Sequence, residues 1–181
     1  SKKKGIWWGR NYGAKFAKGK YLVFVDADTA LKRRYLEEIR HYLDNGYVGI
    51  SAGFGLTGND QKTRVLEELV NYYWIANSKV RRKPLIGFNV AVPRTAFDKI
   101  GGFKKKNVED EQLNSDLAEV GEILFLKKRL VVTSTRRLDD YGFFGICRYY
   151  LDLILVDNRL VKGNPYGRFL KHKKYKPAGR L

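Results

Sequence analysis

The sequence contains no methionine, one cysteine, two histidines and four prolines among its 181 residues. Because an intact reading frame begins with methionine, this absence predicts a processed, trimmed or partial chain. The polar and basic start has no recognisable signal peptide. The lone Cys147 excludes an internal disulfide framework, and together with His41 and His172 it gives no zinc-binding spacing. We expect Cys147 to be a small buried residue.

Long apolar runs are missing as well. No uninterrupted apolar stretch reaches the length of about 18 residues that a membrane-spanning helix needs. The 44% hydrophobic and 14% aromatic content is typical of a globular chain, and 181 residues are enough for one domain with a sizeable core. These residues alone therefore do not predict an integral membrane protein.

Negative charge is scarce, with 19 acidic residues against 36 basic ones and a net charge of +17. Such an excess predicts a negatively charged partner, which could be nucleic acid, anionic lipid headgroups or a phosphorylated substrate. Charge alone does not choose among these three. The last twenty residues concentrate the cations at Lys162, Arg168, Lys171, Lys173, Lys174, Lys176 and Arg180.

The apolar pattern alternates between strand-like and helix-like segments, which is typical of an α/β domain. In the helix expected over 61–79, we place five residues on the inward face: Val65, Leu69, Tyr72, Tyr73 and Ala76. The pattern predicts further helices at 7–18, 31–43, 113–120 and 143–161. It predicts strands at 21–25, 48–54, 85–92, 123–126 and 130–133. We divide the chain into a core over 1–142 and an amphipathic helix with a basic tail over 143–181.

Two carboxylates stand at the end of the first expected strand. The apolar run 21–25 is followed by Asp26-Ala27-Asp28-Thr29, an Asp-x-Asp pattern. In open α/β sheets, ligands bind outside the carboxyl ends of strands, and carboxylate oxygens there suit Mg²⁺ or Mn²⁺ carrying a diphosphate. By itself the spacing is equally compatible with capping of the next helix.

Four motifs follow one another in an order that goes beyond chance spacing. They are Arg10-Asn11-Tyr12-Gly13 leading to Asp26-Ala27-Asp28, Gly87-Phe88-Asn89, Ile100-Gly101-Gly102-Phe103, and Glu109-Asp110-Glu111-Gln112-Leu113. This series resembles the central block of family 2 glycosyltransferases, which are nucleotide-sugar enzymes of GT-A fold. The resemblance covers essentially the whole chain.

The resemblance implies a GT-A-like, Rossmann-like architecture with a mixed, mostly parallel sheet flanked by helices. Members of the family normally carry further strands before the Arg-Asn-x-Gly block, so we expect the first strands to be lacking here. A sheet without them exposes an unpaired edge, and we expect lower stability or association into a homo-oligomer.

The resemblance also implies roles for the acidic residues. Asp28 is the expected Mn²⁺ or Mg²⁺ ligand, and Asp26 lies nearer the ribose or supports the metal. Asp110 is the preferred base for the acceptor hydroxyl in an inverting reaction, with Glu109 as the alternative. The competing interpretation is that Glu109, Asp110 and Glu111 only complement the dipole of the helix that follows.

Other residues of the motifs are expected to contact donor or acceptor. Arg10 and Asn11 resemble residues on the nucleotide side of the cleft, and a guanidinium suits phosphate. Arg136 and Arg137 are candidates for the leaving diphosphate or a phosphorylated acceptor, although two surface arginines after a strand fit equally well. The loop Gly101-Gly102-Phe103 permits close backbone approach, and the family places it against the acceptor or donor sugar.

The C-terminal helix carries a broad apolar surface interrupted by charges, and the basic tail follows it directly. This combination fits an anionic membrane surface and a lipid-linked acceptor, while an ordinary helix packed on the sheet explains the pattern equally well. We expect a cytoplasmic protein, with peripheral attachment at the cytoplasmic membrane face left open.

The sequence therefore predicts a metal-dependent glycosyltransferase that uses a nucleotide-sugar donor. Alternatives are a basic nucleic-acid-binding protein, disfavoured because no helix-turn-helix, zinc or RNA-recognition signature is present, and a noncatalytic GT-A fragment or interaction module. The sequence does not identify the donor base and sugar. It also leaves the acceptor (a sugar, lipid-linked or protein group), the linkage and the pathway open.

Overall fold

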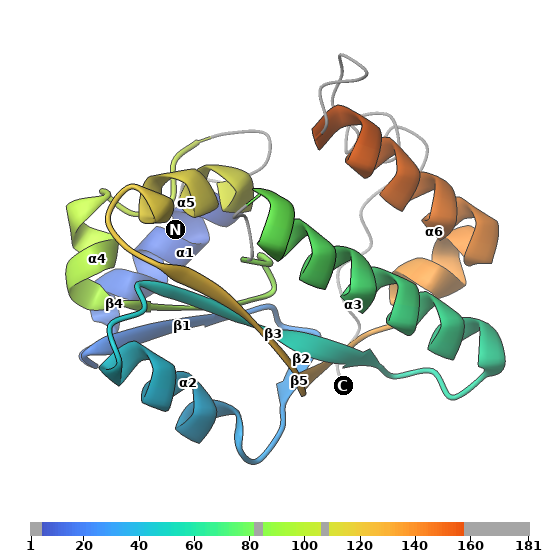
Figure 1. The fold of residues 1–181 in the computed structure, drawn as a ribbon, viewed down its shortest axis with the longest axis horizontal. Helices are drawn as coiled ribbons and strands as arrows, with labels where there is room; N and C mark the ends of the chain where they lie inside the picture. Colours follow the sequence, from blue (N-terminus) through green and yellow to red (C-terminus); the bar gives the residue numbers. More distant parts are fainter. Residues whose placement is uncertain (1–4, 82–84, 106–108, 158–181) are drawn as a thin grey trace.

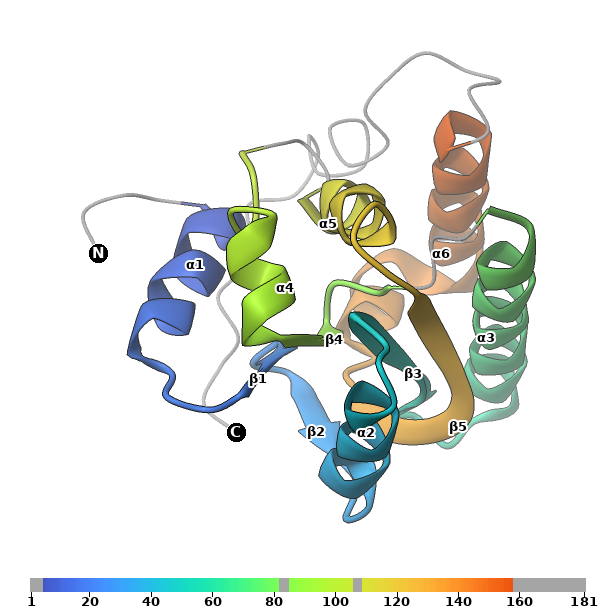
Figure 2. The same cartoon turned by 60° about the vertical axis from the view of Figure 1, so that its left-hand side comes forward.

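The computed structural model describes residues 5–81, 85–105 and 109–157. Helices cover both faces of a five-stranded sheet, with α2 on one face and α4 and α5 on the other (Figures 1 and 2). The helices are α1 (Ile6–Phe16), α2 (Tyr35–Asp44), α3 (Gln61–Arg81), α4 (Arg94–Lys99), α5 (Glu109–Ala118) and α6 (Arg136–Asp157). The strands are β1 (Tyr21–Val25), β2 (Thr29–Leu31), β3 (Gly49–Leu56), β4 (Asn89–Pro93) and β5 (Ile123–Thr133).

The sheet is mixed and has the strand order β1-β4-β3-β5-β2. β3 and β5 pair in parallel, whereas β1 with β4, β4 with β3, and β5 with β2 pair antiparallel. β1, β3 and β5 therefore run in one direction, and β4 and β2 run in the other. This arrangement confirms the mixed α/β fold expected from the sequence, although only the pair β3–β5 of this sheet is parallel.

Two apolar clusters hold the layers together. One is centred on Tyr35 and Ile39 of α2 and Ile50 of β3, and the other joins Leu22 of β1 to Leu117 of α5. Each cluster lies between helices and the sheet, which removes apolar area from water at about 25 cal/mol per Å². No helix in the described part of the chain is both long and apolar enough to cross a bilayer.

The sheet ends at β1, whose outer edge is open among the described residues. Hydrogen bonds from Arg94 N to Lys20 O and from Asp26 N to Phe88 O direct the even-numbered residues of β1 toward β4. The backbone groups of Tyr21, Val23 and Val25 therefore point outward, because successive residues of an antiparallel strand alternate. An unpaired edge is what the family resemblance predicted; association into a homo-oligomer stays a prediction.

Besides the strand expected over 85–92, which begins only at Asn89, three element predictions were wrong. Thr29–Leu31 was expected to lead into a helix, but it forms strand β2, because it pairs with residues 131–133 of β5. The expected strands 123–126 and 130–133 form the single irregular strand β5. The helix expected from residue 143 begins at Arg136 and kinks at Gly142, where φ is 70°. The domain boundary at 142/143 falls at this kink and stays a prediction.

The inward face of α3 was also predicted wrongly. Of the five predicted residues, Val65, Leu69 and Tyr72 are exposed and the other two are half-buried, whereas Leu66 and Val70 are buried. The side of α3 that carries Asn71 and Glu67 faces β3 instead. The reason is a set of hydrogen bonds to the sheet that the apolar pattern does not encode.

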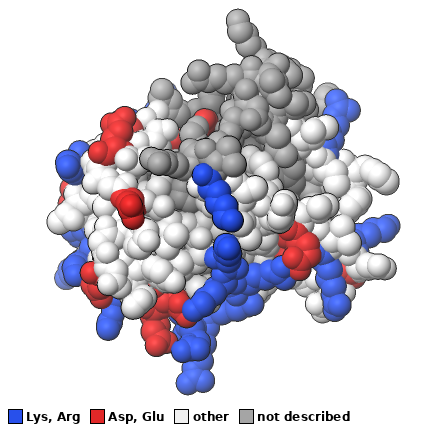
Figure 3. Space-filling view, in the orientation of Figure 1, with Lys and Arg blue, Asp and Glu red and all other residues white. Residues whose placement is uncertain are grey.

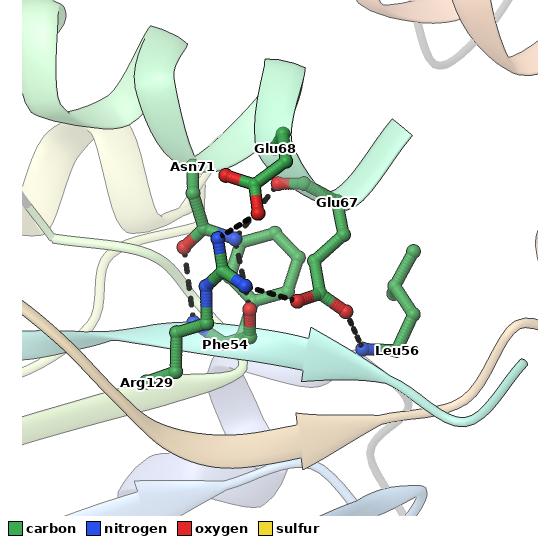
Figure 4. A network of polar contacts seen from close by, with 6 residues as sticks. All are labelled: Phe54, Leu56, Glu67, Glu68, Asn71 and Arg129. Carbon is green, nitrogen blue, oxygen red and sulfur yellow. Dashed lines mark hydrogen bonds and ion pairs between the residues drawn. The ribbon is translucent and has the colours of Figure 1, made fainter. Parts of the chain in front are cut away.

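These hydrogen bonds lie beside a register shift between β3 and β5 (Figure 4). Ala52 is paired with Leu126, but Gly53 is paired with Arg129 and Phe54 with Val131. On the edge of β3 that is turned away from β5, the Asn71 side chain donates to Phe54 O at 2.8 Å and accepts from Phe54 N at 3.1 Å. Asn71 is 5% exposed, so the side-chain amide replaces a strand partner inside the protein.

Two carboxylates complete this network (Figure 4). Glu67 accepts from Leu56 N at 2.8 Å and from Arg129 Nη1 at 2.8 Å, and Glu68 binds Arg129 Nη2 at 2.5 Å. The hydrogen bond to Glu68 raises the pKa of the Arg129 guanidinium above its ordinary value. The network fastens α3 to the sheet at the irregular part of β5.

We expect Asn71→Leu to lower the free energy of unfolding by about 2–4 kcal/mol, because it leaves the buried N–H and C=O of Phe54 without partners. Urea unfolding followed by circular dichroism measures the change. Asn45→Ala is the matched control, because Asn45 is exposed and bonds only within its own helix end. A loss no larger than that of the control would contradict the role of Asn71.

Candidate functional site

The Asp26–Asp28 loop leaves the carboxyl end of β1 and is held by its backbone. Asp26 N donates to Phe88 O at 3.2 Å, and Thr29 N donates to Asp26 O at 3.0 Å. Ser134 N donates to Asp28 O at 3.1 Å, which ties the loop to the segment before α6. The carboxylates are partly exposed, at 44% for Asp26 and 33% for Asp28. Both are therefore fixed at the sheet edge and accessible to a ligand.

Arg10 lies on α1 with its guanidinium turned inward. Its side chain is only 12% exposed. Nη2 donates to Asp26 Oδ1 at 3.0 Å and to the carbonyl oxygen of Gly87 at 2.7 Å. The guanidinium also lies 5.2 Å from the ring centre of Phe103. Arg10 thus connects three segments of the site and compensates the charge of Asp26.

Asn11 positions the glycine loop. Its Nδ2 donates to Phe103 O at 2.7 Å, and its Oδ1 accepts from Phe103 N at 2.9 Å. Gly101 and Gly102 have φ values of +76° and +74°, a conformation that favours glycine. The Phe103 side chain is 2% exposed and packs against Phe24 in the core. Gly101 is exposed, whereas Gly102 is buried and the Phe103 backbone is bonded to Asn11, so Gly101 is the part of this loop that is open to a ligand.

Asp28 has its own cationic neighbour. Arg136 Nη2 lies 3.4 Å from Asp28 Oδ2, and the Arg136 side chain is 38% exposed. Arg136 begins α6, and its N–H donates to Ser134 Oγ at 3.1 Å. The backbone of Arg137 follows in α6, but its side chain lies outside the described residues. The structure thus brings Arg136, one of the two predicted arginines, to the Asp-x-Asp pair.

Asp110 occupies the first turn of α5. Its Oδ2 accepts from Gly87 N at 3.2 Å, and its Oδ1 accepts from Glu111 N at 3.1 Å. The Glu109 side chain lies outside the described residues, so the choice between Glu109 and Asp110 stays a prediction.

Gly87 links the two sides of the site. Its carbonyl oxygen binds Arg10, which binds Asp26, and its N–H binds Asp110. The sequence predicted roles for these three side chains but none for the glycine between them. It also gave no role to Asn89 of the Gly87-Phe88-Asn89 motif, which is buried and accepts from Ala52 N of β3, and it missed Asn114, which is buried and accepts from Leu85 N. The sequence signal of Asn114 is a polar residue at a position where the pattern expects burial.

The protein supplies only part of the ligand set that a hard divalent cation needs at this site. Within residues 5–81, 85–105 and 109–157, no group of three or more His, Cys, Asp or Glu could hold a metal ion. Asp26 and Asp28 supply carboxylate oxygens, the ligand type that Mg²⁺ and Mn²⁺ prefer, and both cations commonly complete their coordination with phosphate and water. The residues present therefore fit a metal that arrives with a diphosphate.

Comparison with solved structures shows the fold. The chain is similar to the mannosyltransferase PcManGT from Pyrobaculum calidifontis in complex with GDP-Man and Mn²⁺, with a TM-score of 0.55 and 16% identity. It is also similar to S. aureus TarS 1-349, with a TM-score of 0.51 and 16% identity. In both cases 93% of this chain is covered, but only 48% and 55% of those structures. The chain therefore spans about half their length.

Sequence comparison extends the finding. No curated protein sequence matches the chain. The family model "Glycosyl transferase family 2" matches residues 1–103, which include Arg10, the Asp26–Asp28 loop and the glycine loop. This match covers more than half of the chain, and the chain therefore belongs to glycosyl transferase family 2.

Proposed function

We propose that this domain transfers a sugar from a nucleotide-diphosphate donor to an acceptor hydroxyl or phosphate, with a divalent metal and with inversion. The observation that carries the proposal is the connection of Asp26 to Asp110 through Arg10 and Gly87. A pair of carboxylates for a cation and a separate carboxylate for a proton are thereby assembled in one site. The Mn²⁺ and GDP-Man of the similar mannosyltransferase support this assignment.

Asp28 and Asp26 would hold the cation, Mn²⁺ or Mg²⁺, which would offset the negative charge that develops on the departing diphosphate. Arg10 and Arg136 balance the two carboxylates in the free protein, at 3.0 and 3.4 Å. Because Arg136 is more exposed than Arg10, we assign it to the diphosphate and assign Arg10 to holding Asp26 in place.

Asp110 is assigned as the base. As the acceptor oxygen attacks the anomeric carbon, its proton moves to the Asp110 carboxylate and the diphosphate leaves from the opposite side. This path inverts the anomeric configuration. The N–H groups of Gly87 and Glu111 hold the carboxylate in one orientation.

We extend the proposal to an acceptor that is presented at an anionic membrane surface. Phe144 and Leu151 of α6 are 86% and 54% exposed. Lys and Arg side chains, with acidic ones among them, gather at the lower edge of the face shown in Figure 3, away from α6. The basic tail itself lies outside the described residues. Sedimentation with vesicles of anionic lipid tests membrane binding and the peripheral location; equal sedimentation after removal of residues 163–181 would contradict a role of the tail.

The experiment for the proposed function is calorimetric titration of the full chain with GDP and with UDP, each with and without Mn²⁺. We expect one of the two nucleotides to bind, with Mn²⁺ raising its affinity by about tenfold or more. Equal affinity with and without the metal would overturn metal dependence. Binding to RNA or DNA that weakens steeply with salt, without any affinity for the nucleotides, would favour the nucleic-acid alternative.

A further inference from the structure

The segment from Leu85 to Phe88 leads into β4, and side chains from several elements hold its backbone. Asn114 of α5 donates to Leu85 O at 2.9 Å and accepts from Leu85 N at 2.8 Å. Ser51 of β3 accepts from Ile86 N at 2.9 Å, and Asn89 N donates to Ile86 O at 3.0 Å. Side chains and backbone groups of the surrounding elements thus leave this segment little freedom to move.

Gly87 lies at the point of this segment where the two halves of the site meet. On one side its carbonyl oxygen accepts from Arg10 Nη2 at 2.7 Å, and the same nitrogen binds Asp26. On the other side its N–H donates to Asp110 Oδ2 at 3.2 Å. We propose that Gly87 is a positioning residue that sets the Asp110 carboxylate at its place beside the Asp26–Arg10 pair. The inference rests on the proposed function, in which Asp110 is the base.

The absence of a side chain at Gly87 is a spatial requirement. A Cβ atom there would lie 2.9 Å from Asp110 Oδ2 and 3.3 Å from Asp110 Cγ. The φ angle of Gly87 is outside the left-handed region, so the backbone itself would accept another residue. The group that must yield to a Cβ is therefore the Asp110 carboxylate, and it can yield by rotating because it is the end of a side chain.

The anchoring of α5 confines this displacement to the carboxylate. Asn114 bonds both backbone groups of Leu85, and it also donates to Asp110 O at 3.0 Å. These contacts hold the helix against the segment whether or not the carboxylate is in place. A methyl group at residue 87 is therefore expected to turn the base away and leave Asp26, Asp28 and Arg10 where they are.

The first test compares Gly87→Ala with wild type in two measurements. Titration with the nucleotide that binds wild type, in the presence of Mn²⁺, reports the donor side. Hydrolysis of the corresponding nucleotide sugar, with water as acceptor, reports turnover. We expect the affinity to change by less than about twofold and kcat to fall about tenfold to hundredfold, because small displacements of a reacting group cost this much. Equal losses in affinity and rate would overturn the proposal.

Gly9→Ala is the matched control. Gly9 lies in α1 outside the motifs, and a Cβ there would meet nothing within 4 Å. We expect this variant to retain wild-type turnover and affinity. A rate loss as large as that of Gly87→Ala would show that the effect does not depend on the contact with Asp110, and would also overturn the proposal.

A double-mutant cycle supplies a readout that does not need turnover. Asp110→Ala removes the atoms nearest to the new Cβ, so Gly87→Ala should shift the Tm less in this background than in wild type, and should not lower kcat further. Additive shifts in Tm would overturn the proposed coupling between residue 87 and the Asp110 side chain, even if Gly87→Ala strongly destabilises the protein. If the Tm shifts are non-additive but wild type neither binds nucleotide nor hydrolyses the donor, the coupling between residue 87 and Asp110 stands. The proposed function is then refuted instead.

Discussion

Asp110→Asn is expected to lower the rate of glycosyl transfer by about 10²–10⁴-fold, the range for loss of a general base. The amide has the shape of the carboxylate, and its oxygen can still accept from Gly87 N. The variant should therefore keep its fold and its nucleotide affinity while losing the proton acceptor. Donor turnover with saturating acceptor or with water, measured beside calorimetric affinity, separates the two effects.

Glu111→Gln is the control for this variant, because it makes the same change one residue along α5. We expect it to retain turnover close to wild type. Glu109→Gln decides between the two base candidates, since the Glu109 side chain lies outside the described residues. A large loss in Glu109→Gln together with an active Asp110→Asn would move the role of base to Glu109.

Asp28→Ala is expected to lower the Mn²⁺-dependent affinity for nucleotide by about 100-fold or more, which corresponds to about 3 kcal/mol. The substitution removes one of the two carboxylates at the end of β1 and releases Arg136 from its ion pair. The freed guanidinium can still attract a diphosphate. We therefore expect weak nucleotide binding that no longer responds to the metal.

Calorimetry with and without Mn²⁺ measures this change, and electron paramagnetic resonance of free Mn²⁺ gives a second readout. Asp98→Ala is the matched control, because Asp98 is an exposed aspartate on α4, away from the end of β1. An Asp28→Ala variant that still gains affinity on addition of Mn²⁺ would contradict the role of Asp28 as a ligand.

Local patterns were enough to predict most elements of the fold. The apolar run Tyr21–Val25 forms β1, and the helical spacing of Tyr35, Ile39 and Leu43 matches the buried face of α2. Such segments bury one side along a regular period, and the period is visible in the residue types. The ordered motifs likewise indicated the family that the family model then matched.

Elements whose conformation depends on distant partners could not be predicted in this way. Thr29–Leu31 is a strand because it pairs with β5, about a hundred residues later in the chain. The orientation of α3 follows from Asn71 and Glu67, which bond to backbone groups of Phe54 and Leu56 in β3. Neither these contacts nor the register shift of β5 has a periodic signal.

The same division applies to the site around Asp26-Ala27-Asp28. The sequence by itself determined which residue types stand at the end of β1, since carboxylates after an apolar strand can be recognised locally. Only the tertiary structure decided what surrounds them. Arg10 turns inward and donates to Asp26 and to the carbonyl oxygen of Gly87, and the N–H of Gly87 donates to Asp110 of α5. These contacts join residues 10, 26, 87 and 110, and the geometry that joins them arises only when α1, β1, α5 and the segment before β4 pack together.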